Sequence, residues 1–147
     1  MKKRKRKKRR KRCRYYVNTN FFVDLDEGKR EAIELAKRNR GALCTSTVLV
    51  YEYRQYGIGY VAKRLARRYG IRVYKLAVLT LLEEASSIAG PSASANTVFD
   101  YAHILAAKRI GAKTFVTSDK ASCRRAIRLG LCCLNHRSGE TLCPTQE

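Results

Sequence analysis

The chain has 147 residues, of which 45% are hydrophobic, and it carries a formal net charge of +20 with an isoelectric point near 10.2. This length allows one domain with a hydrophobic core, and the longest apolar run, at residues 75–82, excludes a membrane span because a transmembrane helix needs about 18 apolar residues. No apolar segment follows the basic N terminus, so we expect no signal peptide and a cytoplasmic location.

The first fourteen residues form a basic arm that contains twelve of the 32 Lys and Arg residues and no acidic residue. The basic residues are Lys2, Lys3, Arg4, Lys5, Arg6, Lys7, Lys8, Arg9, Arg10, Lys11, Arg12 and Arg14. Their mutual repulsion predicts that the arm is disordered unless it binds nucleic acid. The strong positive charge favours nucleic acid over a membrane as the partner. The alternative interpretation is a solubilising or nuclear-targeting tail.

Short strands alternate with helices after the arm. The hydrophobic pattern predicts strands at residues 15–17, 42–45, 113–117 and 131–134, and an extended link or short strand at 71–75. Helices are expected at residues 21–40, 46–56, 58–69, 76–89, 96–110 and 121–129. This alternation predicts one α/β domain over residues 15–135, with a mostly parallel sheet and right-handed crossovers. Residues 136–147 are expected to form a loose C-terminal tail.

The helix predicted at residues 58–69 has one apolar face and one basic face. The basic face contains Lys63, Arg64, Arg67 and Arg68. It indicates either a solvated surface or a surface that contacts RNA, and both interpretations stay open.

The six cysteines contain no C-x-x-C pair, so we expect no zinc site. We interpret Cys44, Cys123 and one of Cys132 and Cys133 as small buried apolar side chains. Disulfides are the alternative if the protein comes from a hyperthermophile, because intracellular disulfides occur in such organisms.

Four polar residues stand at strand ends or on helices in positions that can meet. Asn18 and Asp119 follow predicted strands, Glu52 borders the apolar face of a helix, and Asp100 is expected in the first turn of another. Because open α/β sheets place their chemistry at the carboxyl ends of the strands, we expect a shared acidic pocket there.

Each of these residues also has a structural interpretation. Glu52 could pair with an arginine such as Arg54, and Asp100 could favour a helix N terminus. Asp119 could cap the helix that follows it, and Asn18 could form an Asx turn.

A family resemblance rests on four segments: VNTNFF at 17–22, VYEYRQ at 50–55, FDYAHILAAKRIGA at 99–112 and TFVTSDKA at 114–121. In this order they resemble the PIN-domain family of compact nucleases, over about residues 15–135. The resemblance implies a three-layer α/β/α fold in which Glu52, Asp100 and Asp119 match three acids that hold Mg²⁺ or Mn²⁺ for phosphodiester hydrolysis. Thr117 or Ser118 would match a hydroxyl near that site.

The chain departs from the family at the first acidic position, where it has Asn18. An Asn carbonyl is a weak neutral metal ligand and brings no charge, so metal binding and water activation would weaken. Asp24, six residues further on, is not expected to reach the site. His103, one turn after Asp100, could contact it, and both His103 and His136 are interpreted as structural or surface histidines.

These observations favour an RNA-binding PIN-domain protein that is catalytically degenerate and needs no cofactor. Its basic arm would anchor it to rRNA in a ribonucleoprotein, the ribosome being the most specific version of the hypothesis. The alternative is an active Mg²⁺- or Mn²⁺-dependent endoribonuclease of the toxin or RNA-processing type, with an antitoxin-like partner for a toxin. A weaker third hypothesis is a DNA-binding or viral nucleoprotein role.

Overall fold

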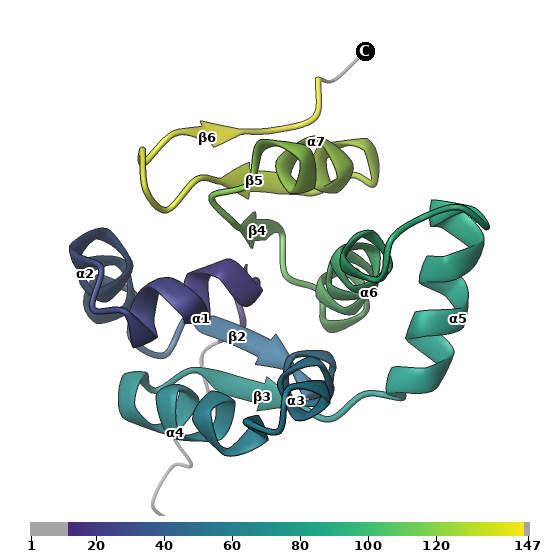
Figure 1. Ribbon diagram of the computed structural model, residues 1–147. Helices are drawn as coiled ribbons and strands as arrows, with labels where there is room; N and C mark the ends of the chain where they lie inside the picture. Colours follow the sequence, from purple (N-terminus) through teal and green to yellow (C-terminus); the bar gives the residue numbers. More distant parts are fainter. Residues whose placement is uncertain (1–11, 146–147) are drawn as a thin grey trace, which may run out of the picture.

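A computed structural model describes residues 12–145 and shows helices on both sides of one sheet (Figure 1). The helices in this part are α1 Thr19–Asp26, α2 Arg30–Arg38, α3 Thr47–Gln55, α4 Gly59–Tyr69, α5 Val78–Ala89, α6 Ala95–Ile110 and α7 Lys120–Arg128. The strands are β1 Tyr15–Val17, β2 Leu43–Ser46, β3 Arg72–Tyr74, β4 Thr114–Val116, β5 Cys132–Leu134 and β6 Thr141–Leu142. They form one sheet in the order β3-β2-β1-β4-β5-β6, in which only β6 is antiparallel to its neighbour. The predicted α/β fold with a mostly parallel sheet is confirmed.

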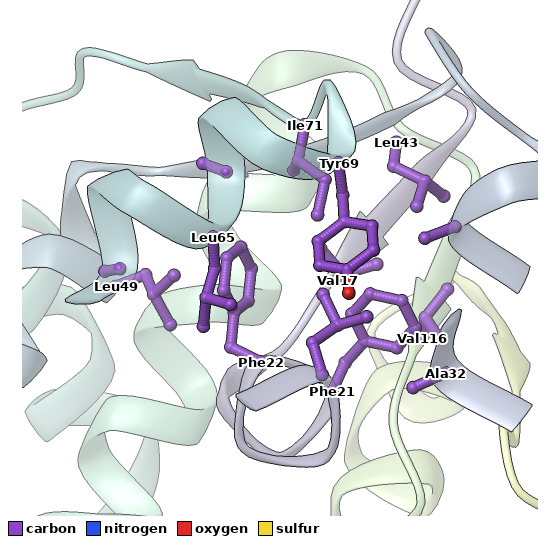
Figure 2. Packing of buried hydrophobic residues seen from close by; sticks show 14 of the residues in the cluster. Val17, Phe21, Phe22, Ala32, Leu43, Leu49, Leu65, Tyr69, Ile71 and Val116 are labelled. Atoms are coloured by element: carbon purple, nitrogen blue, oxygen red, sulfur yellow. The ribbon is translucent and has the colours of Figure 1, made fainter. Parts of the chain in front are cut away.

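The two faces of the sheet are covered by different helices because side chains alternate along each strand. In β1, Val17 packs in a cluster with residues of α1, α2 and α4, whereas Tyr16 packs in a second cluster with residues of α5, α6 and α7. Figure 2 shows the first cluster, in which Phe21 and Phe22 lie against Val17 and α4. Each of these fully buried phenylalanines contributes roughly 1.5–3 kcal/mol through its burial. The result is a three-layer α/β/α arrangement.

The helix expected at residues 21–40 is in fact two helices, so that prediction was wrong. The chain turns at Gly28, whose φ of 74° is a left-handed conformation that glycine adopts without steric cost. The amide of Gly28 donates to the carbonyl of Leu25 at 3.1 Å and closes α1, and α2 starts again at Arg30.

Residues 136–145 pack against the rest of the domain, so the expectation of a loose tail was wrong for this segment. Strand β6 pairs with β5, and a disulfide joins Cys132 to Cys143. His136 and Arg137 both contact the buried carboxylate of Asp24 on α1. The segment therefore completes the sheet and fastens it to α1.

All six cysteines are paired, as Cys13–Cys44, Cys123–Cys133 and Cys132–Cys143. Our preferred interpretation as unpaired apolar side chains was wrong, and the alternative of disulfides is the one observed. Cys44 and Cys133 are nevertheless fully buried, as expected.

The basic residues Lys2 to Lys11 lie outside the described residues. Arg12 and Arg14 lie within them, and their side chains are exposed on either side of the buried Cys13. In residues 12–145, no helix is both long enough and apolar enough to cross a membrane.

Candidate functional site

A cleft of about 410 Å³ opens at the carboxyl ends of β1 and β4, and Asn18, Glu52, Asp100 and Asp119 all line it. Asn18 directly follows β1 and caps α1, and Asp119 caps α7 two residues after Thr117. Glu52 comes from α3 and Asp100 from α6. The structure thus brings the four polar residues singled out in the sequence to one place.

Asn18 presents its amide nitrogen to the cleft rather than its oxygen. Its side-chain oxygen accepts from the backbone N–H of Thr19 at 2.7 Å, which caps α1. Its nitrogen donates to Asp100 Oδ1 at 3.3 Å, and the residue is only 6% exposed. Because the oxygen is already used, Asn18 faces Asp100 as a donor.

Asp100 is held by an arginine that the sequence did not single out. Arg125 on α7 places its Nη1 3.0 Å from Asp100 Oδ2, and this carboxylate is nearly buried. Asp100 is also not in the first turn of its helix, because α6 starts at Ala95 with Ser94 as its cap. The expected position of Asp100 in the first turn was therefore wrong, and so was the alternative that it stabilises the helix N terminus. Its partner is a cation from a neighbouring helix.

Glu52 is held by hydrogen bonds from both sides of the cleft. The hydroxyl of Thr19 donates to Glu52 Oε1 at 2.5 Å, and His103 Nε2 lies 3.0 Å from the same oxygen. Burial opposes ionisation of Glu52, but the contacts with His103 and Thr19 outweigh it and lower the pKa of the carboxyl. The side chain of Glu52 is bonded to His103 and Thr19 and forms no ion pair with Arg54, so that suggested pairing was wrong.

His103 belongs to a hydrogen-bonded chain that runs from the core to the cleft. Its side chain is 1% exposed, and its Nδ1 lies 2.7 Å from the hydroxyl of Tyr16, which is itself 2.7 Å from Ser46 Oγ. Burial raises the pKa of Tyr16 far above its usual range, so this hydroxyl keeps its proton. In the tautomer that carries a proton on Nε2, His103 donates from Nε2 to Glu52 and its Nδ1 can accept from the Tyr16 hydroxyl. His103 therefore contacts Glu52, whereas the sequence suggested a contact with Asp100.

Asp119 is the most exposed of the four residues. Its Oδ1 accepts from the N–H of Ala121 at 2.8 Å, so it forms the N-cap that the sequence offered as a structural alternative. The hydroxyl of Thr117 accepts from the amide nitrogen of Asn20 at 2.9 Å and from the N–H of Asp119 at 3.2 Å. These bonds fix the turn after β4 at the rim of the cleft.

The side chains as arranged do not fit a divalent cation. Asp100 is engaged by Arg125 and Asn18, Glu52 by Thr19 and His103, and Asp119 by the backbone of α7. In the part of the chain that the structure describes, no three His, Cys, Asp or Glu side chains are grouped so that they could hold a metal ion. A Mg²⁺ site would need these carboxylate oxygens directed at one point.

Residues that the sequence did not single out complete the cleft. The sequence alone does not identify Arg125 as the partner of Asp100, because Arg124 stands next to it. The orientation of α7 determines which of the two arginines faces Asp100. The predicted basic face of α4 lies elsewhere: its four basic side chains are exposed, and none of them lines the cleft.

No protein-family model matches this sequence, and no curated protein matches it either. The class that the structure defines is a three-layer α/β protein with a polar cleft at the carboxyl edge of its sheet. The acidic residues of that cleft are largely balanced by cations and donors from the same chain.

Proposed function

We propose that the chain is an RNA-binding protein of the PIN-domain type that has lost metal-dependent nuclease activity. Its basic arm anchors it in a ribonucleoprotein, and the ribosome, with rRNA as the ligand, is the most specific version of the proposal. The four sequence segments that resemble the PIN family and the three-layer arrangement of the helices support the assignment.

One observation supports the proposed loss of nuclease activity: Asp100 is paired with Arg125 and faces the amide nitrogen of Asn18. A metal-dependent phosphodiesterase needs carboxylates that are free to bind the cation that activates water. Here Arg125 supplies the positive charge beside Asp100, and an N–H donor faces this carboxylate from the position where the family has an acid.

The RNA-binding part of the proposal rests on charge. The side chains of Lys63 and Arg67 on α4 are exposed and form no ion pair or hydrogen bond with another described residue. Such side chains are available for phosphates, which position an RNA without selecting its sequence.

The catalytic part is tested by incubating the full chain with structured and unstructured RNA in the presence of Mg²⁺ or Mn²⁺. We expect no cleavage and no change in melting temperature when either metal is added. Asn18→Asp should instead gain a metal-dependent rise in melting temperature, because it places a second carboxylate beside Asp100. Asn39→Asp, outside the cleft, is the matched control. Cleavage by the wild-type chain that Asp100→Asn abolishes would overturn the proposal.

The anchoring part is tested by sedimentation with ribosomal subunits. Deleting residues 1–11 removes ten basic residues and leaves Cys13 to form its disulfide with Cys44. We expect this deletion to abolish co-sedimentation without changing the melting temperature. Retained co-sedimentation at high salt after the deletion would count against the arm as anchor.

An active endoribonuclease is the second candidate, because Glu52, Asp100 and Asp119 do line one cleft. It would take Mg²⁺ or Mn²⁺, and a toxin of this type would have an antitoxin-like partner. The cleavage experiment described above distinguishes it from the first candidate.

The proposed location is the cytoplasm. Three disulfides are unusual for a cytosolic protein of a mesophile, but cytosolic proteins of hyperthermophiles contain them. A cytoplasmic location therefore goes together with a source of that kind.

A further inference from the structure

A second cleft, of about 440 Å³, lies between α3, α4 and the edge strand β3, and it shares no residue with the polar cleft. Val50 and Val73 contribute apolar side chains to its wall, and Tyr51 contributes a half-buried aromatic ring. No acidic residue lines it. Its size is in the range of pockets that bind small organic molecules, roughly 300–1,000 Å³.

Three cations stand around this apolar cleft: Arg54 from α3, and Lys63 and Arg67 from α4. Helical spacing explains why they meet there. Arg54 lies three residues after Tyr51, and Arg67 lies four residues after Lys63, so each pair shares a helix face. All three residues are exposed, so a ligand can reach them.

The charged side chains of these three residues form no ion pair or hydrogen bond with another residue in the described part of the chain. Other arginines of the protein do have acidic partners: Arg30 pairs with Glu34, Arg109 with Glu84 and Arg125 with Asp100. Three unpaired positive charges around an apolar and aromatic cleft have the chemistry to bind an anion that carries a flat apolar group.

We infer that this cleft binds a nucleotide, with the base against Tyr51 and the apolar wall and the phosphate at Arg54, Lys63 and Arg67. Aromatic rings stack on bases of any identity, and the planar guanidinium group matches two phosphate oxygens at once. A free nucleotide and a nucleotide within an RNA strand present the same groups.

A neighbouring groove favours the nucleotide within a strand. This groove, of about 530 Å³, is lined by Tyr60, Lys63, Arg64, Arg67 and Arg68, so Lys63 and Arg67 belong to both depressions. A strand that follows the basic face of α4 can thus place one base in the cleft. In this form the inference rests on the proposed RNA-binding function.

The first experiment measures binding of AMP, adenosine and inorganic phosphate to the full chain by calorimetry at physiological salt. We expect AMP to bind more tightly than either of the other two. Arg54→Ala and Arg67→Ala should each weaken AMP binding about tenfold, the typical effect of losing one charge-assisted hydrogen bond. Arg68→Ala removes the same charge from the exposed face of α4, outside this cleft, and should change AMP binding less than about twofold. Equal effects of all three variants, or AMP binding no tighter than phosphate, would overturn the inference.

The second experiment repeats the series with a short single-stranded RNA. A larger loss for Arg54→Ala than for Arg68→Ala would place a nucleotide of the strand in the cleft. If AMP binding depends on Arg54 but the chain does not bind RNA, the cleft is a site for a free nucleotide. That result would contradict the proposed function. If the chain binds RNA but not AMP, and neither Arg54→Ala nor Arg67→Ala weakens RNA binding, the inference that this cleft binds a nucleotide is wrong. The proposed RNA-binding function would then still hold.

Discussion

Asp24 is a buried carboxylate that connects the C-terminal segment to α1. It is 1% exposed, and it accepts from Nε and Nη2 of Arg137, each at 2.8 Å, while His136 Nε2 lies 2.8 Å from Oδ2. The hydrogen bond with Arg137 lowers the pKa of Asp24, burial opposes this, and the hydrogen bond with His136 lowers the pKa further. The other ring nitrogen of His136 is buried without a partner in the described residues, which fits a neutral ring protonated on Nε2.

Replacing Asp24 with alanine should destabilise the protein by about 2–4 kcal/mol, because His136 Nε2 would be left buried without an acceptor. The measurement is urea unfolding at pH 7. Asp26→Ala is the control: this carboxylate is exposed and lies 3.8 Å from Arg64, so its loss should cost under about 0.5 kcal/mol. Equal effects of the two substitutions would contradict the role of Asp24.

Stability should fall in two steps as the pH is lowered. Burial lowers the pKa of His136 in the folded state, so below about pH 6.5 the unfolded chain binds more protons and the free energy of unfolding decreases. The pKa of Asp24 is also lowered on folding, so its contribution is present above about pH 4 and is lost as the pH falls further. Unfolding curves between pH 7.5 and pH 3 measure both steps. In His136→Asn the first step should shrink, and an unchanged first step would show that it has another origin.

At the scale of elements, the sequence predicts helices and strands well where hydrophobic periodicity is strong. Helix α4 is within one residue of its predicted range because apolar residues recur at helical spacing and Gly70 follows in a left-handed conformation. The helix expected at residues 96–110 begins one residue earlier, at Ala95, because Ser94 is a good cap and its hydroxyl accepts from the N–H of Thr97. The helix break at Gly28 is not predicted, because a single glycine inside a charged segment resembles a tolerated helical residue.

The partners of the site residues could not be predicted in the same way. The spacing of Asn18, Glu52, Asp100 and Asp119 relative to strands and helices is visible in the sequence, and topology brings them together. Which cation pairs with which acid depends on helix phase and on contacts between residues far apart in the chain. Arg125 reaches Asp100 from α7, and Thr19 reaches Glu52 on α3 from α1.

The β5–β6 hairpin should loosen without the disulfide between Cys132 and Cys143. The pair closes a loop between residues 11 apart, and its loss should cost up to about 3 kcal/mol. We expect the double variant Cys132→Ala/Cys143→Ala to show faster amide exchange in β6 and unchanged exchange in α4. The double variant Cys13→Ala/Cys44→Ala is the control. In this variant we expect amide exchange in β6 to stay slow compared with exchange in the rest of the sheet. Unchanged exchange in β6 after loss of Cys132–Cys143 would show that strand pairing alone holds the segment.

For the whole molecule, charge decides how RNA binding responds to salt. If the chain neutralises about eight phosphates of single-stranded RNA, the logarithm of the binding constant should fall with the logarithm of salt concentration with a slope of about −6. Without residues 1–11, contacts such as Arg54, Lys63 and Arg67 remain, and three of them give a slope of about −2. Binding measured between 50 and 300 mM salt tests this. Equal slopes for the full and truncated chains would mean that the arm makes no phosphate contacts.

Cys132 and Cys133 are neighbours in β5, and each belongs to a different disulfide. The native pairs are separated by 10 and 11 residues, and exchanging their partners would give separations of 9 and 10. Because the entropy of loop closure barely changes over this range, an unfolded chain has almost no preference between the two pairings. The preference arises once β5 has formed, since neighbouring side chains of a strand point in opposite directions and only one can reach α7. Formation of β5 therefore determines which cysteines pair. Oxidation of the folded chain should give Cys123–Cys133 and Cys132–Cys143, whereas oxidation of a denatured chain should also give the exchanged pairs.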